Sequence, residues 1–159
     1  MTYLVWKTIH VASVVIFLGN IATGLFWASH ALTSRDLGNI AATFEGISKS
    51  DRWFTVPGVI GILASGVAAA VKGHLPILGT SWILWSVVLF SISGIVFGVW
   101  LAPLQQRLIA IARAADDSEA GWNTFNQAYR KWETWGLVAL LAPAAALVIM
   151  VLKPELPGL

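Results

Sequence analysis

The chain contains no cysteine and only two methionines among its 159 residues. Without cysteine there can be no disulfide, no thiolate metal site, no iron-sulfur cluster and no covalently attached c-type haem. Two methionines are too few for a thioether pathway that carries Cu(I), because a soft metal needs several soft ligands. The composition therefore excludes these classes of site and disfavours a copper transporter.

Charged residues are also scarce. They make up 11% of the chain and hydrophobic residues 57%, whereas about a quarter of a soluble domain is charged. We therefore expect a membrane protein in contact with the lipid bilayer, with residues 1–159 forming one transmembrane domain. The net charge of +2 comes from residues in short segments, and no basic run is interleaved with aromatic residues, so nucleic acid is not an expected partner.

Long stretches lack any charged residue, and about 20 such residues suffice to cross a bilayer as a helix. Four of them predict transmembrane helices over residues 8–32, 53–71, 80–106 and 134–152. Pro57 falls near the predicted start of the second helix, where its missing amide donor costs little. The predicted fold is all-α: an up-down bundle of four transmembrane helices.

The linkers before the second and fourth helices predict amphipathic helices. In residues 34–51, Leu37, Ile40, Ala41, Phe44 and Ile47 recur at helical spacing. In residues 107–132 an aromatic stripe has the same spacing and comprises Trp122, Phe125, Tyr129 and Trp132. We expect both segments to lie at the membrane interface as surface anchors.

The basic residues predict the orientation. Six lie in these two linkers and a seventh, Arg52, directly follows the first of them, against three on the opposite side, namely Lys7, Lys72 and Lys153. Because basic loops stay in the cytoplasm, the linkers should face inward and both termini outward. The expected location is the cytoplasmic membrane of a bacterium.

Several kinds of chemistry lack their residues. Charge-free spans contain no proton relay, no ion-coupling carboxylate and no voltage-sensing arginine, which disfavours a pump or an ion-coupled transporter. The sequence has no serine-histidine-acid set, no paired carboxylates within the spans and no phosphate-binding loop. Hydrolytic chemistry is therefore not supported.

His10 is the strongest candidate for a metal ligand, because an ionisable group within a membrane span is costly and often functional. It lies about two turns inside the first helix. Phe17 and Gly24 share its stripe at 100° per residue, and three polar residues flank it: Lys7, Ser13 and Asn20. A glycine in line with an imidazole leaves room for a flat macrocycle, and imidazole is an axial ligand of haem iron. The alternative is a neutral histidine bonded to a neighbouring helix.

The other two histidines differ in depth. His74 follows the second helix on the outer side, where it could be a second axial ligand or a solvated turn residue. His30 lies 20 residues, about 30 Å, from His10, so the two cannot bind one iron. We expect His30 at the cytoplasmic interface.

Two further features concern helix packing. Gly94 and Gly98 form a GxxxG motif in the third helix, which predicts an internal helix contact or, alternatively, a homodimer face. Pro143 lies in the middle of the fourth helix and frees the carbonyl of Ala139. That carbonyl is an acceptor available to a buried donor.

Four stretches together resemble a bacterial family of predicted integral membrane proteins, domain of unknown function 2269. They are Trp6-Lys7-x-x-His10, residues 51–58 (DRWFTVPG), residues 79–82 (GTSW) and residues 151–154 (VLKP). More distantly, the layout is similar to the HemJ family of membrane protoporphyrinogen oxidases. That resemblance implies haem b binding through the histidine matching His10.

The chain departs from the HemJ pattern after Trp82, where an essential lysine is missing. Porphyrinogen oxidation is therefore in doubt, and whether the protein is an enzyme stays open. The leading hypothesis is a haem b protein for electron transfer or redox chemistry, with Lys7, Ser13 and Asn20 near the ligand. The alternatives are a cofactor-free accessory subunit or homo-oligomer of a larger membrane complex, and a HemJ-like porphyrinogen oxidase.

Overall fold

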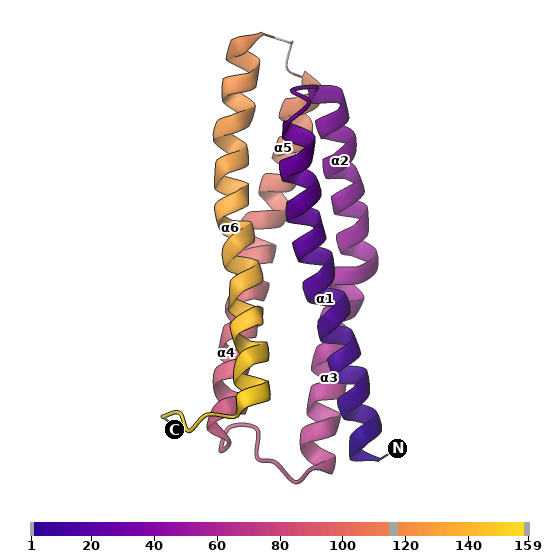
Figure 1. Ribbon diagram of the computed structural model, residues 1–159, viewed down its shortest axis with the longest axis vertical. Coiled ribbons are helices and arrows are strands. Elements are labelled where there is room, and N and C mark those ends of the chain that lie inside the picture. The colour runs from indigo at the N-terminus through magenta and orange to yellow at the C-terminus, as the bar shows by residue number, and fades with distance from the viewer. Residues whose placement is uncertain (1, 115–117, 158–159) are drawn as a thin grey trace.

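The computed structural model describes residues 2–114 and 118–157 of the chain. In these ranges the chain forms four long helical rods and no strand (Figure 1). The rods run over α1 (Tyr3–Leu32), residues 37–72, residues 81–114 and α6 (Glu119–Leu152). Each is long and apolar enough to cross a membrane, which confirms the prediction of an all-α protein with four spanning helices.

The second and third rods are each built from two α-helices joined by a π-helical turn. The second comprises α2 (Leu37–Ser50), η1 (Asp51–Thr55) and α3 (Val56–Lys72). The third comprises α4 (Ser81–Val96), η2 (Phe97–Leu101) and α5 (Ala102–Ala114). The second rod therefore begins at Leu37, and the amphipathic helix predicted in residues 34–51 runs directly into the span predicted over residues 53–71.

A proline follows each π-helical turn by two residues and gives the physical reason for it. Pro57 follows η1 and Pro103 follows η2. A proline inside an α-helix lacks the N–H for its hydrogen bond and clashes with the carbonyl four residues earlier. In each turn an amide just before the proline donates five residues back, from Val56 to Asp51 and from Ala102 to Phe97. The wider turn lets the helix continue through the proline.

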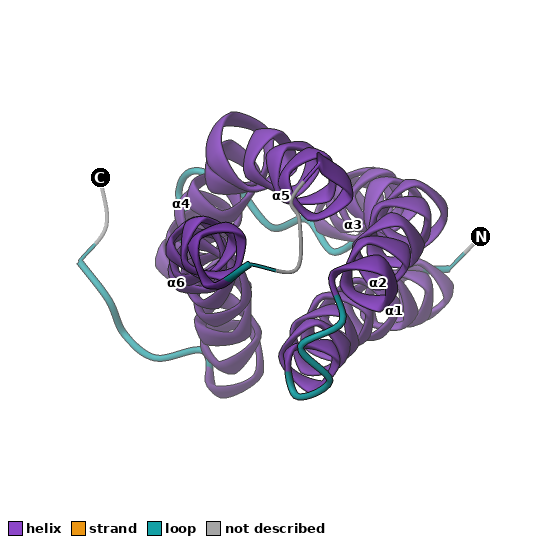
Figure 2. Cartoon of the chain, turned by 90° about the horizontal axis from the view of Figure 1, so that it is seen from above, coloured by secondary structure: helices purple, strands orange, loops and turns teal. Residues whose placement is uncertain are grey.

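The start of α1, the end of α6 and the α3–α4 connection lie at one end of the bundle, and the α1–α2 turn, the end of α5 and the start of α6 lie at the opposite end (Figure 1). We call these the terminal end and the loop end. At the terminal end α1 packs against α3 and α4 against α6. At the loop end α2 packs against α5, and α5 against α6. Seen along the bundle, α1, α2 and α3 lie on one side and α4 and α6 on the other (Figure 2).

The loop end has the denser core. Its largest fully buried side chains are Phe44 of α2, Phe125 of α6, Ile40 and Leu108. Phe44 contacts Trp132 edge to face, with ring centroids 4.9 Å apart. These are the apolar faces of the two amphipathic segments.

The segments are thus helical and amphipathic as expected, but the expectation that their apolar faces anchor on the membrane surface is wrong. Phe125, Tyr129 and Trp132 are buried against α2, with Trp132 only 2% exposed. The physical reason is that each segment continues a spanning helix in line, so its apolar stripe meets the stripes of neighbouring helices rather than lipid. Helices of 30 to 36 residues are about 45–54 Å long, well beyond the ~30 Å hydrocarbon core.

Serine hydroxyls join α4 to α6. Ser93 Oγ donates to the carbonyl oxygen of Ala139 at 2.7 Å, and both residues are buried. The prediction that Pro143 leaves this carbonyl available to a buried donor is confirmed. About two helical turns earlier on α4, Ser86 Oγ donates to the carbonyl oxygen of Ala146 at 3.3 Å.

The GxxxG motif of α4 and η2 makes no such contact. A methyl group placed on Gly94 or Gly98 would meet no atom within 4 Å outside its own helix backbone. Their neighbours Ile95 and Val99 are each 57% exposed. Internal packing, one of the two expectations for this motif, is therefore not what these glycines provide in the described chain.

Candidate functional site

A cavity of about 440 Å³ lies between the α1–α3 pair and the α4–α6 pair, at the terminal end. Its walls are mainly apolar side chains from all four helices. Phe17 of α1 and Phe90 of α4 both line it and contact each other with ring centroids 5.6 Å apart. Both lie among the lining residues farthest from the terminal end, so this aromatic pair forms part of the inner wall. The size lies within the range of small-molecule and cofactor sites.

His10 of α1 brings an imidazole to this cavity, and its hydrogen bond defines the tautomer. Nδ1 lies 3.0 Å from the carbonyl oxygen of Ile62 in α3. A carbonyl only accepts, so Nδ1 carries the hydrogen and the neutral ring keeps its lone pair on Nε2. Histidines that bind metals usually have this arrangement, in which one ring nitrogen donates to a backbone carbonyl and the other is the ligand.

Small residues of α3 make room for the ring. A methyl group on Gly66 would lie 3.0 Å from Cε1 and 3.1 Å from Nδ1 of His10. The hydroxyl of Ser65 lies 3.4 Å from Nδ1, and Ser65 is itself 1% exposed. The backbone of α3 therefore approaches the imidazole closely enough for the carbonyl of Ile62 to hold it.

Two lysines lie at the outer opening of the cavity. Lys7 is one turn before His10 on α1, and Lys153 caps the end of α6. The ammonium of Lys153 lies 5.2 Å from the centroid of the Trp82 ring, within the range of a cation–π contact. The opening is thus cationic, whereas the walls are apolar.

The structure brings some of the predicted site residues together and separates others. Lys7, His10 and Phe17 line the one cavity. Ser13 instead packs against Gly61 of α3, and Gly24 faces Ile47 of α2. Neither lines the cavity.

Two other predicted residues lie elsewhere. Asn20 bonds to the η1 turn, as described below. His74 is exposed in the turn after α3, with a left-handed backbone (φ 52°), and is not among the residues that line the cavity. The structure therefore offers His10 alone as a histidine of this cavity.

Sequence reasoning missed a polar cluster around Asp51, the first residue of η1. Asn20 Nδ2 donates to Asp51 Oδ1 at 3.0 Å, Thr55 Oγ1 donates to the same oxygen at 2.8 Å, and Gln105 Nε2 donates to Oδ2 at 3.3 Å. Ser50 donates in turn to the amide oxygen of Asn20. The cluster ties α1, η1 and α5 together where the dense core ends. Two features of the sequence point to this cluster. Asp51 is an acidic residue next to the start of a charge-free span, and Asn20 is an amide inside the first span.

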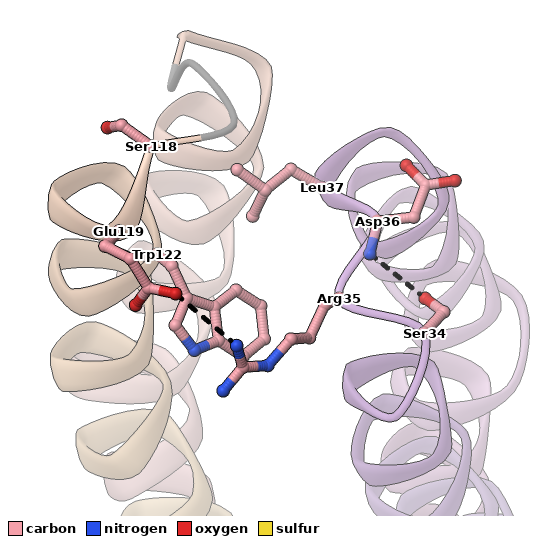
Figure 3. Close-up of a pocket in the computed structure, with 7 residues that line it drawn as sticks. All are labelled: Ser34, Arg35, Asp36, Leu37, Ser118, Glu119 and Trp122. Atoms are coloured by element: carbon pink, nitrogen blue, oxygen red, sulfur yellow. Dashed lines mark hydrogen bonds and ion pairs between the residues drawn. The ribbon is translucent and has the colours of Figure 1, made fainter.

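A second depression lies at the loop end, between the α1–α2 turn and the start of α6 (Figure 3). Arg35 reaches across it, with Nη1 3.6 Å from Glu119 Oε1 and Cζ 5.3 Å from the Trp122 ring centroid. Both charged side chains are more than 65% exposed, so the ion pair contributes little. The charged side chains of this ion pair are solvated, and the cavity beside His10 is the better candidate.

In the part of the chain that the structure describes, no three His, Cys, Asp or Glu side chains gather into a metal-binding group. Among these residues His10 therefore has no partners of these four types with which to hold a metal ion.

Comparison with known proteins identifies the family to which the chain belongs. A family model described as "Predicted integral membrane protein (DUF2269)" matches residues 4–154. No curated protein and no solved structure gives a significant match.

Proposed function

The chain belongs to DUF2269, a family of predicted integral membrane proteins, and from the geometry of its cavity we propose that it is a haem b protein of the membrane in which His10 is an axial ligand. The observation behind this proposal is the geometry of His10: its Nδ1–H is bound by the carbonyl of Ile62, and its ring lies at the wall of an apolar cavity. The remaining nitrogen, Nε2, has the lone pair that iron binds.

The residues around the cavity fit such a group. The carbonyl of Ile62 fixes the tautomer and the orientation of the ring. Gly66 keeps the ring close to α3, and the pair of Phe17 and Phe90 adds aromatic surface to the inner wall. When bound, haem b supplies one-electron redox chemistry, which is why we assign the protein to electron transfer or a related redox function.

The test is a visible spectrum of the purified protein in detergent, recorded before and after addition of dithionite. We expect a Soret band that shifts on reduction and that is lost in His10→Ala. His30→Ala is the matched control, because His30 is exposed at the loop end and its loss should leave the band unchanged. Absence of haem from wild-type protein produced with ample haem would refute the proposal, and full occupancy in His10→Ala would refute the ligand assignment.

His74→Ala tests the second axial position. His74 lies outside the cavity lining, so we expect its replacement to leave the spectra of the oxidised and reduced protein unchanged. A change of spin state in this variant would instead identify His74 as the second ligand.

We further propose that the protein lies in the cytoplasmic membrane of a bacterium with its terminal end outside. The loop end carries the basic residues that normally stay in the cytoplasm. Because the chain has no cysteine, single cysteines can report sidedness. An impermeant maleimide should label Leu78→Cys but not Thr33→Cys in intact cells.

A second candidate function, an accessory subunit or homo-oligomer, is favoured by the open glycine face of Gly94 and Gly98. Glycines that meet no helix of their own chain are available to another helix in the membrane. Disulfide cross-linking of Gly98→Cys in membranes tests a symmetric contact at this face.

A further inference from the structure

The outer opening of the cavity has two positive charges that come from different helices. Lys7 is on α1, and Lys153 directly follows α6. Lys153 adopts a left-handed backbone conformation (φ 48°), and its amide donates to the carbonyl of Ile149 at 2.8 Å. With its ammonium over the Trp82 ring, the side chain is held at the opening rather than extended away from it.

Neither charge is neutralised by the protein in the described ranges. The residues that line the cavity include no Asp or Glu. The two ion pairs found among residues 2–114 and 118–157 join Arg35 to Glu119 and Arg113 to Glu45, and all four residues belong to the loop half. The cavity therefore combines a positive opening with walls that are mainly apolar and carry no acidic side chain.

We propose that the cavity binds an anionic amphiphile, whose acidic head is held by Lys7 and Lys153 and whose apolar body lies against the walls between the two helix pairs. An ammonium paired with a carboxylate or phosphate forms a charge-assisted hydrogen bond. Mainly apolar walls favour an apolar body, because a polar group buried against them without a partner is costly. The head sits where the helices end, near the membrane–water boundary.

This inference deepens the proposed function and shares its cavity, but it does not depend on His10 or on iron. The acid could be the propionates of a porphyrin or the head group of a lipid acid from the outer leaflet. Both have the same chemistry at the opening, and they differ in the body that must fit between Phe17, Phe90 and the helix walls.

Lys72 provides a matched control. It ends α3 at the same end of the bundle and is exposed like Lys7 and Lys153, but it does not line the cavity. If the lysines acted only as general anchors at the membrane boundary, all three would behave alike. A head-group site predicts that Lys72 alone is dispensable.

The experiment measures binding of two acid–ester pairs to the purified protein in a neutral detergent at low salt, by the fluorescence anisotropy of the probe. The first pair is protoporphyrin IX, which carries no iron, and its dimethyl ester. The second is a fluorescent long-chain fatty acid, parinaric acid, and its methyl ester. Wild type is compared with Lys7→Ala, Lys153→Ala and Lys72→Ala.

We expect the acid of at least one pair to bind more tightly than its ester. Lys7→Ala and Lys153→Ala should each weaken acid binding roughly two- to fivefold without affecting the ester, because the lysines are partly solvated, and Lys72→Ala should match wild type. A preference confined to the fatty acid supports the head-group site and identifies a lipid acid as its occupant. Equal binding of acid and ester in both pairs, or an equal loss in Lys72→Ala, would overturn the inference.

Because the probes contain no iron, this result is separate from the spectrum that tests His10. A protein that binds acids but shows no Soret band would retain the head-group site and refute the haem proposal. A haem-loaded protein in which Lys7→Ala and Lys153→Ala leave acid binding unchanged would support the haem proposal and refute the head-group site.

Discussion

The hydrogen bond from Ser93 to Ala139 yields a quantitative prediction, because Pro143 determines how much this bond contributes to the free energy of unfolding. Ala139 would normally accept from the amide of residue 143, and proline has none. Ser93 Oγ is the donor that replaces it, at 2.7 Å and with Ser93 only 1% exposed. Ser93→Ala therefore leaves a buried carbonyl without this partner.

The expected cost follows from known hydrogen bonds in membrane proteins. These average about 0.6 kcal/mol and reach about 1.7 kcal/mol, and an unsatisfied buried carbonyl costs about 1–3 kcal/mol. We expect Ser93→Ala to lower the free energy of unfolding by about 1–2 kcal/mol. In a Pro143→Ala background the restored amide takes over the carbonyl, and the same substitution should cost less than about 0.5 kcal/mol.

The assay is reversible unfolding by SDS in mixed micelles, followed by circular dichroism and analysed as a double-mutant cycle. Ser91→Ala is the control, since Ser91 lies two residues away on α4 and is exposed, so its effect should stay within about 0.5 kcal/mol. If Ser93→Ala costs the same with and without Pro143, to within about 0.3 kcal/mol, then Pro143 is not the reason for this bond.

Three further predictions concern the cavity, the core and the polar cluster. Gly66→Ala should reduce the haem content measured by the Soret band, because the added methyl lies 3.0 Å from the His10 ring, while Gly94→Ala, which meets nothing within 4 Å, should leave the band unchanged. Phe44→Ala should lower the free energy of unfolding in mixed micelles by about 3–5 kcal/mol, since Phe44 is fully buried, and a loss below about 1 kcal/mol would mean that the loop end does not unfold with the bundle. Asp51→Leu should lower the free energy of unfolding by about 2–4 kcal/mol in the same assay, because Asn20, Thr55 and Gln105 lose the acceptor to which they donate. Asp51→Asn keeps an acceptor oxygen and should lower it by less than half as much.

The four spans were predictable because lipid imposes a simple rule on composition. A charge-free segment of 20 residues has few alternatives to a helix. The free carbonyl of Ala139 was predictable for a similar reason, since the effect of Pro143 depends only on local geometry. Its partner, Ser93, was not, because the pairing depends on how α4 meets α6.

The continuity of the second rod through Pro57 has a local cause. A proline is favoured in the first turn of a helix, so Pro57 near the start of a charge-free segment predicts a helix beginning there. A π-helical turn accommodates the same proline in the helix interior. The sequence pattern is compatible with both, and the outcome depends on the apolar stripe of α2 finding a partner in α5 and α6.

The candidate site was partly visible. The stripe of Lys7, His10 and Phe17 follows from helical periodicity, and the structure gathers these residues at one cavity. Ser13 and Asn20 lie on the same helix but face α3 and η1. Which flank of His10 opens to the cavity depends on where α3 packs, and Lys153 reaches the opening only because α6 ends at the same level as α1 begins.

The two π-helical turns also determine which lengths this chain can tolerate. Each turn inserts one residue beyond α-helical count, and one residue corresponds to a rotation of about 100°. Because the wider turn absorbs this extra residue, deleting one residue between Asp51 and Thr55 would return η1 to α-helical count and leave Ile62, Ser65 and Gly66 facing His10. Deleting one residue from the first turn of α3 would instead rotate them away. A single-residue deletion should therefore be tolerated better at these two turns than within α3 or α4, where no wider turn absorbs the change of phase.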